Sequence, residues 1–399
     1  MWKQRPVKKT ETSVFISSFN NSSSRLHVPQ LSHSSFTISI PNSLESKLNL
    51  PSLLLSFLLL TGLVPEFSKN LQLQKVWFIF YLLLLSQILD MLVMLIINFE
   101  NRTTLKSHAA YLFSVFCNIM IWHSLRRKKK NLLNVLRVIQ KCPATHNRRT
   151  NIMVLIILSF PFVYSVTSIL TCNITSDYLL YAYGYELKSL IMQASVIFFK
   201  KFLLFLFHST FPSLVAVLFC YLCLRFSLSF NCLTRTVLHY SPEEFGPSEQ
   251  IEILRQKAKI DDIMENLQDI FSLPSFFLIM SHLFTCGSHL GMNLTGNHSK
   301  IIIVKAVFYG MTNLVSLVVV LWIAGSVPVE QNKLKSAFYK KAHSRFLTVL
   351  IPEERHCKRE ILDKTDFVLN GCSIFPYTRN SILALIGTLL TYSLLIYQN

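Results

Sequence analysis

The chain has 399 residues, of which 51% are hydrophobic and only 15% are charged. A chain this long and this hydrophobic is typical of a protein with several membrane-spanning helices, and its composition excludes an ordinary soluble domain. The formal net charge of +18 raises the question of a nucleic-acid partner. The basic run 126–130 lies between two predicted membrane helices, however, where it serves to orient the chain, so we expect no nucleic-acid partner.

The first 46 residues are rich in Ser, Asn and basic residues and show little apolar periodicity. This composition predicts a disordered cytoplasmic tail, followed by a membrane domain over residues 47–399. The segment 50–64 is apolar, but it is bounded by Pro51 and Pro65 and is short for a span. We expect an interfacial or re-entrant piece there, and an additional span is the alternative.

Seven further segments are apolar and long enough to cross a bilayer as helices, which predicts an all-α, multi-pass membrane protein. We expect these spans near residues 76–98, 107–125, 151–171, 202–224, 270–290, 301–325 and 380–397.

The distribution of basic residues orients these spans. Lys and Arg are frequent in residues 125–150 and 326–379, and they are sparse in 99–106, 172–201 and 292–300. The positive-inside rule then predicts a cytoplasmic N-terminus and, after seven spans, an extracellular C-terminus.

Glycosylation sequons support the same orientation. Every loop that the charges place outside carries one, and no inner loop between spans does. The expected acceptors are Asn101, Asn173, Asn293 and Asn297.

Charged residues lie within or beside two of the apolar segments. Asp90 lies in the middle of the first span, where an ionisable group is rare and faces protein or water. It could serve an ion path or could pair with a Ser or Asn of a neighbouring helix. The dipeptide Lys200-Lys201 is expected to mark the outer end of the fourth span.

The inner connections show helical patterns of their own. Residues 241–244 read Ser-Pro-Glu-Glu, the form of a helix start with a capping box. An amphipathic stripe over residues 260–271 leads into the fifth span, and another apolar set follows the sixth. These helices could form a bundle between subunits below the membrane, or each could lie on the membrane surface. The set after the sixth span comprises Leu334, Phe338, Phe346 and Leu350.

The last segment, 379–399, is a nearly unbroken apolar run with its polar residues on one side. The spacing of three and four residues places these positions on one helix face. Lipid offers no partner to the Gln398 amide, so this face must look at protein or at water. Packing between helices through small and hydroxyl residues is one interpretation. The face comprises Ser381, Ala384, Thr388, Thr391, Leu395 and Gln398.

Thr391-Tyr392, followed after five residues by Gln398, resembles the C-terminal signature of the arthropod gustatory receptors, which belong to the insect chemoreceptor superfamily. Residues 61–65 are similar to an element that these receptors carry before their first helix, while Asn399 stands where the family usually has Phe. The resemblance implies a ligand-gated, non-selective cation channel of the plasma membrane that small-molecule tastants open. It also implies a homo- or hetero-tetramer of related receptor subunits, with the last helix lining the pore.

Four last helices around one axis would form a pore with physical logic of its own. Thr388, Thr391 and Gln398 would give polar rings that replace part of an ion's hydration, and Leu395 would form an apolar constriction between them. Tyr392 would pack between neighbouring helices. The negative ends of the helices would favour cations at the outer mouth.

A ligand site should be a mostly apolar cavity that opens outward and has a few polar groups at its edge. Aromatic and histidine residues in the outer halves of the spans are the candidates. Tyr residues are also enriched at membrane interfaces, and lone histidines more often pack or form hydrogen bonds than bind ligands. The candidates are Tyr164, Tyr181, Phe205, His208, His282 and Tyr309.

Other functional classes find little support. The sequence contains no Gly-rich phosphate loop, zinc-protease motif or nucleophile elbow, and the nine cysteines show no metal-ligand spacing, so we expect no enzyme and no cofactor. The predicted orientation is the reverse of that of a G-protein-coupled receptor, so we expect no G protein. A secondary transporter of a small solute or a non-conducting accessory subunit remains the alternative, although the internal repeats typical of transporters are missing.

Overall fold

A computed structural model describes residues 50–64, 71–97, 102–139, 147–294, 300–348, 361 and 367–398. All of them belong to one compact unit, Ser43–Asn399. The predicted tail, residues 1–46, lies outside the described residues, so the tail and its boundary stay predictions.

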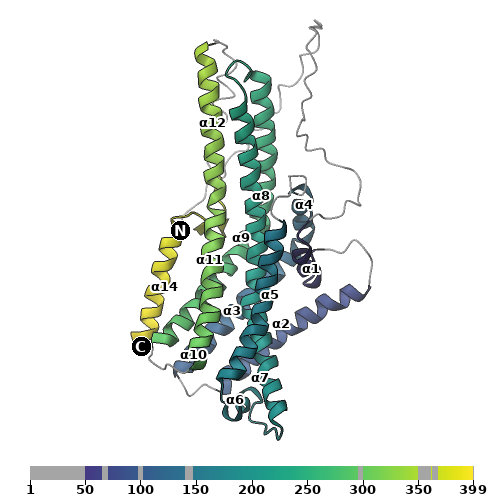
Figure 1. Cartoon of the computed structure of the whole chain (residues 1–399), viewed down its shortest axis with the longest axis vertical. Coiled ribbons are helices and arrows are strands. Elements are labelled where there is room, and N and C mark those ends of the chain that lie inside the picture. Colours follow the sequence, from purple (N-terminus) through teal and green to yellow (C-terminus); the bar gives the residue numbers. More distant parts are fainter. Residues whose placement is uncertain are drawn as a thin grey trace, which may run out of the picture. The chain divides into compact units, whose positions relative to one another are not determined.

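The described chain is almost entirely helical (Figure 1). Two π-helical segments, η1 (Leu206–Thr210) and η2 (Ala306–Gly310), interrupt α-helices, and a short antiparallel hairpin, β1 (Asn370–Gly371) and β2 (Phe375–Pro376), precedes the last helix. The α-helices are α1 (Ser52–Leu60), α2 (Leu71–Ile97), α3 (Arg102–Arg127), α4 (Lys129–Ile139), α5 (Asn147–Thr171), α6 (Ile174–Tyr181), α7 (Leu190–Phe205), α8 (Phe211–His239), α9 (Pro247–Leu294), α10 (Lys300–Lys305), α11 (Met311–Ala324), α12 (Ser326–Thr348) and α14 (Ser381–Gln398).

Helices occupy all the predicted spans, and a helical multi-pass membrane fold is confirmed. Within the described residues, five helical stretches are long and apolar enough to cross a bilayer: Val76–Ile97, Arg148–Thr171, Leu190–His239, Pro247–Leu290 and Ile303–Leu347. Helices α3 and α14 occupy the two remaining predicted spans, and α14 is apolar over Ser381–Thr391.

Helix α3 contains more polar residues than the other spans, and buried polar side chains of this helix form hydrogen bonds to neighbouring helices. The Ser114 hydroxyl lies 2.8 Å from the Ser281 hydroxyl and 3.1 Å from the Thr285 hydroxyl. One turn further along α3, the Asn118 amide donates to the Phe207 carbonyl at 2.9 Å. These groups are buried and satisfy one another, so hydropathy alone underestimates how well this helix fits a membrane interior.

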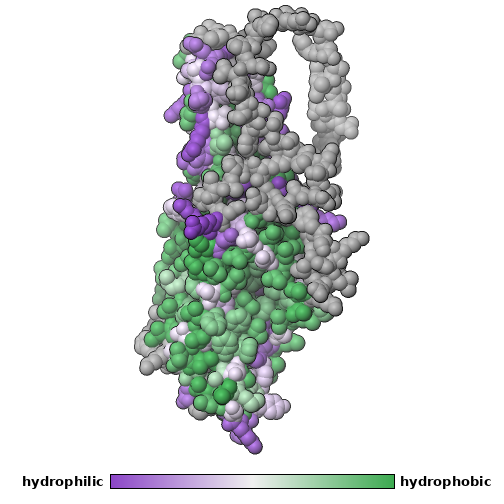
Figure 2. All heavy atoms as spheres, turned by 45° about the vertical axis from the view of Figure 1, so that its right-hand side comes forward, coloured by the Kyte–Doolittle hydropathy of each residue, from purple (hydrophilic) through white to green (hydrophobic). Residues whose placement is uncertain are grey.

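Three helical stretches extend far beyond the bilayer thickness. Helix α9 has 48 residues, which at about 1.5 Å per residue gives roughly 72 Å, more than twice a hydrocarbon core of about 30 Å. The ends of α8, α9 and α12 run together in the upper part of Figure 1, and we name this part the helical extension. Figure 2 shows hydrophilic residues over that end and hydrophobic residues over the part below it. Helical extensions beyond the apolar part are therefore present as predicted, and α12 packs along α8 there. That they bundle between subunits below the membrane stays a prediction.

Apolar packing holds the extension together. Leu334 and Phe338 of α12 are fully buried, and the Phe338 ring meets the Phe245 ring at 5.2 Å. Phe346 is half-buried, and Leu350 lies outside the described residues. These positions recur along one face of α12, which packs along α8.

The predicted capping box forms, but not at a helix start. The Ser241 N–H donates to Glu244 Oε2 at 3.0 Å, and the Glu244 N–H donates to Ser241 Oγ at 3.2 Å. Residues 242–244 form a turn, and α9 begins only at Pro247. Hydrogen bonds from the Ser241 backbone and hydroxyl lower the pKa of the Glu244 carboxyl. The box thus closes the connection between α8 and α9.

The segment 50–64 forms a helix of nine residues, which is too short to span a membrane. Leu54 and Leu58 are fully buried, and the Trp122 indole donates to the Thr61 carbonyl at 2.9 Å. Gly62 has φ +68°, and a Cβ there would lie 2.8 Å from Trp77 Cβ. The prediction of a non-spanning piece is confirmed, and Gly62 is the residue that permits its turn.

The fourth span begins earlier than predicted. The helix starts at Leu190 and not near residue 202, and α6 lies within the predicted loop 172–201. Lys200 and Lys201 are therefore inside α7, and the expectation that they mark a helix end is wrong. Lys200 Nζ lies 2.5 Å from Asp90 Oδ1. The mid-span carboxylate thus pairs with a lysine, not with the Ser or Asn that the sequence suggested.

Candidate functional site

Helix α14 packs on α9 by one face and leaves another exposed. Leu385 and Leu389 are buried, whereas Thr388 and Thr391 are exposed. Each Thr hydroxyl donates to the carbonyl four residues earlier at 2.9 Å. The backbone stays helical to Gln398. The side chains of Tyr392, Leu395 and Gln398 lie outside the described part of the chain, so their predicted pore roles stay predictions.

The hairpin β1–β2 ties the start of α14 to α9, and the sequence analysis did not predict it. The Gln268 amide donates to the Asn370 carbonyl at 2.6 Å, and its oxygen accepts from the Asn370 N–H at 3.0 Å. The Tyr377 hydroxyl, buried to 1% exposure, donates to Ser275 Oγ at 2.7 Å. Polar contacts on successive turns of α9 therefore fix where α14 begins.

A buried group of aromatic rings lies at the end of the helices opposite the helical extension, and we name it the aromatic cluster. Its members come from α3, α5, α7, η1, α9 and η2, and most of their side chains are fully buried. The cluster comprises Tyr111, Tyr164, Phe205, His208, His289 and Tyr309.

Tyr309 occupies the centre of the aromatic cluster. Its ring centroid lies 4.7 Å from that of Phe205, 5.3 Å from that of Tyr164 and 4.8 Å from that of His289, on which it stacks. Tyr111 joins the cluster through His289, because its hydroxyl lies 2.6 Å from His289 Nε2. Its ring meets the His208 ring edge-on at 4.9 Å.

Both π-helical segments of the described chain contribute to this cluster. His208 belongs to η1 and Tyr309 to η2. A π-turn accommodates one more residue than an α-turn and turns the side chains that follow out of α-helical register. Such segments are frequent at functional sites. Two of them on facing helices at one cluster mark it as the candidate binding site.

The aromatic cluster buries polar atoms that have no hydrogen-bond partner in the described part of the chain. Among them are the Tyr164 and Tyr309 hydroxyls, both His208 ring nitrogens, the Ser168 hydroxyl and the Lys201 ammonium. Leaving one such group unsatisfied costs about 1–3 kcal/mol, and more for a charge. A bound polar molecule or water would satisfy them, so the arrangement suits a ligand better than a sealed apolar core.

The structure brings together four of the six predicted ligand residues, Tyr164, Phe205, His208 and Tyr309. Tyr181 lies at the edge, where the Lys201 ammonium is 4.9 Å from its ring. His282 lies apart: its Nδ1 is 2.6 Å from Asn313 Oδ1, and its Nε2 is 3.0 Å from Ser316 Oγ.

Sequence reasoning missed three residues of this region. Tyr111 stands in the predicted second span without any distinguishing pattern, and His289 is a lone histidine of the kind that more often packs than binds a ligand. Lys201 was assigned to a helix end. Because α7 begins at Leu190, Lys201 lies eleven positions inside an apolar helix, and a lysine in such a place indicates a functional site.

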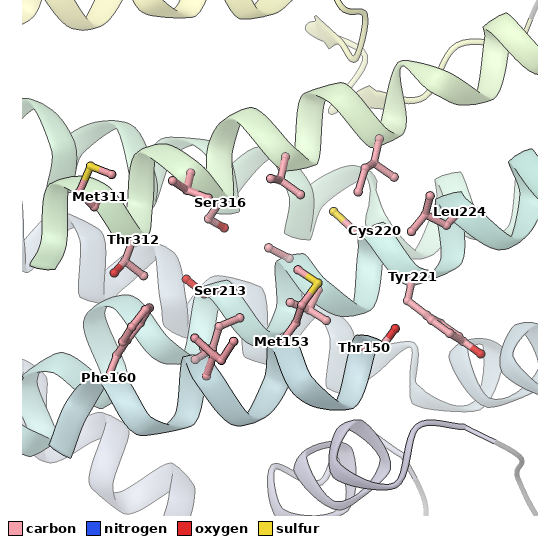
Figure 3. Close-up of a pocket in the computed structure, with 17 residues that line it drawn as sticks. Thr150, Met153, Phe160, Ser213, Cys220, Tyr221, Leu224, Met311, Thr312 and Ser316 are labelled. Atoms are coloured by element: carbon pink, nitrogen blue, oxygen red, sulfur yellow. The ribbon is translucent and has the colours of Figure 1, made fainter. Parts of the chain in front are cut away.

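An apolar pocket of about 380 Å³ lies between α5, α8 and α11 (Figure 3). It touches the aromatic cluster at Phe160, which packs against the cluster and also lines the pocket. Thr312 and Ser213 lie near the same end. The Ser213 hydroxyl is buried and has no partner within the described chain. The pocket has the volume and apolar lining of a small-molecule site.

One of the four predicted glycosylation acceptors can be placed. Asn173 is exposed in the short connection between α5 and α6. Asn101 and Asn297 lie outside the described residues, as does the side chain of Asn293 near the end of α9. Whether these sequons are used stays a prediction.

No protein-family model and no curated protein matches the chain. Solved structures do. The insect olfactory receptor OR5 from Machilis hrabei matches with a TM-score of 0.65 and 14% identity over 84% of this chain and 93% of that one. The same receptor in complex with eugenol matches with a TM-score of 0.65 and 13% identity over the same shares. The chain therefore has the fold of an insect olfactory receptor.

Proposed function

We propose that the chain is a chemoreceptor subunit that forms a ligand-gated, non-selective cation channel opened by small molecules. The fold supports this proposal, because it is that of an insect olfactory receptor, and one of the matching structures holds the small molecule eugenol. The C-terminal signature, Thr391-Tyr392 and Gln398, favours a gustatory receptor over an olfactory one. We further propose a tetramer of the same or related subunits in the plasma membrane.

The observation that carries the proposal is the uncovered polar face of α14. Leu385 and Leu389 hold the helix on α9, while Thr388 and Thr391 project from a face that the described chain leaves exposed. Four copies around an axis would bring these hydroxyls together along a water-filled path. If this face instead packed against another helix, the same hydroxyls would be buried away from water.

The aromatic cluster is the ligand site of the proposed receptor. It combines apolar rings with a few buried polar atoms that lack partners, which are the properties of a small-molecule site. The adjacent pocket adds apolar space beside Phe160. A ligand that contacts Tyr309 and His289 would act on η2 and α9 together.

The proposed orientation places the aromatic cluster and the C-terminus on the outer side. In Figure 1 the C-terminal end of α14 lies at the same end of the chain as α6 and α10, away from the free end of α12. The basic residues of 326–379 would then be cytoplasmic, as the positive-inside rule requires. Loss of an endoglycosidase-sensitive band on Asn173→Gln would support this orientation.

Cysteine accessibility tests the pore. The chain is expressed in cells, and whole-cell currents are recorded against a panel of small organic molecules that includes eugenol. We expect a charged thiol reagent to block the evoked current in Thr388→Cys and Thr391→Cys. Leu390→Cys is the matched control, because Leu390 is exposed but lies about 200° round the helix from Thr388.

Two results would contradict the proposal. Equal modification of all three cysteine variants without block would mean that the Thr face does not line the pathway. Ligand-driven uptake of solute without current would favour a secondary transporter. An evoked current with a reversal potential that follows the cation gradients, and blocks only in the Thr variants, supports the channel.

A further inference from the structure

Two neighbouring lysines of α7 have opposite surroundings. Lys200 is partly exposed, and its ammonium lies 2.5 Å from the Asp90 carboxylate and 2.6 Å from the Tyr183 hydroxyl. Lys201 is 1% exposed, and its ammonium has no hydrogen-bond partner within the described chain. Within the described residues, one lysine thus has a counter-charge and the other has none.

Lys201 occupies the buried face of α7. The buried residues of that helix are four apart, Gln193, Ile197, Lys201 and Phe205, so they form one stripe. Phe205, one turn further along, meets the ring of Tyr164 at 4.9 Å. Lys201 therefore lies one helical turn from Phe205 of the aromatic cluster.

An unpaired ammonium is costly at this place. Ionisable groups within membrane helices pair with one another or face a water-filled cavity. The Tyr181 ring, 4.9 Å from the ammonium, offers a cation–π contact, which replaces only part of the lost hydration. Among the described residues no counter-charge pairs with Lys201, and the unpartnered groups near it are mostly hydroxyls that can donate a hydrogen bond.

We infer that the ligand of the aromatic cluster carries a carboxylate, and that Lys201 binds it as an ion pair. This inference rests on the proposed ligand site. A carboxylate offers only acceptors, with about four lone-pair sites, and so fits a group of donors. The hydroxyls of Tyr164, Ser168 and Tyr309 supply such donors: they lie near one another, and none forms a hydrogen bond of ordinary geometry within the described chain. The apolar part of the acid would contact the aromatic rings.

Binding to the full-length chain in lipid nanodiscs tests the inference without requiring a current. The probes are benzoate and the straight-chain acids from acetate to decanoate at neutral pH, each compared with its primary amide. We expect the best acid to bind about 30-fold or more tightly than its amide, and Lys201→Met to lose that difference. Lys201→Arg keeps the charge and should retain much of it.

Lys200→Gln is the matched control. It removes the neighbouring positive charge, so a mere attraction of anions to a basic surface would weaken acid binding in both variants. We expect acid affinity to change less than about threefold in Lys200→Gln. Acid binding that is independent of Lys201, or no acid binding at all, would overturn the inference.

Thermal unfolding separates a ligand site from an internal ion pair. If the site is empty in the purified protein, Lys201→Met removes an uncompensated buried charge and should raise the Tm by a few degrees. If a carboxylate of the chain itself holds Lys201, the same change should lower the Tm, which would overturn the inference. Benzoate or the best acid should raise the Tm of the unaltered chain and not of Lys201→Met.

Failure of the inference and failure of the proposed function give different results. Acid binding through Lys201 without any evoked current would contradict the channel and leave the inference intact. Currents evoked by the amides and not by the acids would leave the channel intact and overturn the inference.

Discussion

Replacing Lys257 by Met should destabilise the helical extension far more than replacing Lys257 and Asp261 together. The two residues are one turn apart on α9, and Lys257 Nζ lies 2.6 Å from Asp261 Oδ2. Their side chains are only 4% and 6% exposed. Both charges have therefore given up most of their hydration, and the ion pair between them replaces part of it.

The geometry sets the size of the effect. At an effective dielectric constant of about 20, two unit charges at this separation attract by about 6 kcal/mol. Dehydrating two ions costs several kcal/mol each, so the pair as a whole contributes little net stability. The single change leaves the Asp261 carboxylate buried without its lysine, which costs about 3–5 kcal/mol. The double change, Lys257→Met with Asp261→Leu, should cost less than about 1 kcal/mol.

Thermal unfolding of the purified protein in detergent measures these differences. Lys333→Met is the matched control, because Lys333 pairs with Glu330 at 2.7 Å on α12 but is 61% exposed. An exposed pair contributes about 0–1 kcal/mol, so this variant should unfold close to the unaltered chain. The reasoning is refuted if Lys257→Met lowers the Tm no more than Lys333→Met does.

Three further changes test the local structure by the same unfolding measurement. Gly62→Ala should cost about 1–3 kcal/mol, because the new Cβ meets a tryptophan at 2.8 Å and the backbone has φ +68°. Ser241→Ala removes the hydrogen bonds of its hydroxyl to Glu244. The folded pKa of that carboxyl is lowered, so its stabilisation is present above an unfolded pKa of about 4.3 and disappears as the pH falls through the folded value. The Tm difference caused by Ser241→Ala should therefore be seen at neutral pH and shrink in acid. Leu389→Ala should cost about 2–5 kcal/mol because Leu389 is buried against α9, and Leu390→Ala, at an exposed position, should cost much less.

The spans could be predicted because hydropathy reports what a bilayer requires, and the long extensions could be predicted because their apolar residues keep helical spacing. The start of the fourth span could not be predicted in this way. Lys200 and Lys201 look like a boundary in sequence, yet Asp90, more than a hundred positions away, provides the counter-charge for one of them. The hairpin at residues 370–376 could not be predicted, because strands of two residues are too short to show the alternation of apolar and polar residues that marks a strand.

The candidate site was predicted only in part. Tyr164, Phe205, His208 and Tyr309 could be proposed from their place in the outer halves of the spans. Their meeting with Tyr111 depends on tertiary packing and on the two π-turns, which change the register of the helices and which no local pattern announces. The one-sided polar face of α14 followed from periodicity, and Thr388 and Thr391 of that face are exposed. Their place in a pore stays a prediction.

Helix α9 contacts Tyr377, which lies between the hairpin and α14, through Ser275, and it contacts the aromatic cluster through His289. No break in the helix separates the two contacts. They are fourteen positions apart, or roughly 21 Å along the axis. A single inserted or deleted residue between them would rotate one contact by about 100° relative to the other. Substitutions in this stretch can be absorbed by repacking, whereas changes in its length cannot. Among relatives of this chain, the number of residues between these two contacts should therefore be constant even where the residues themselves differ.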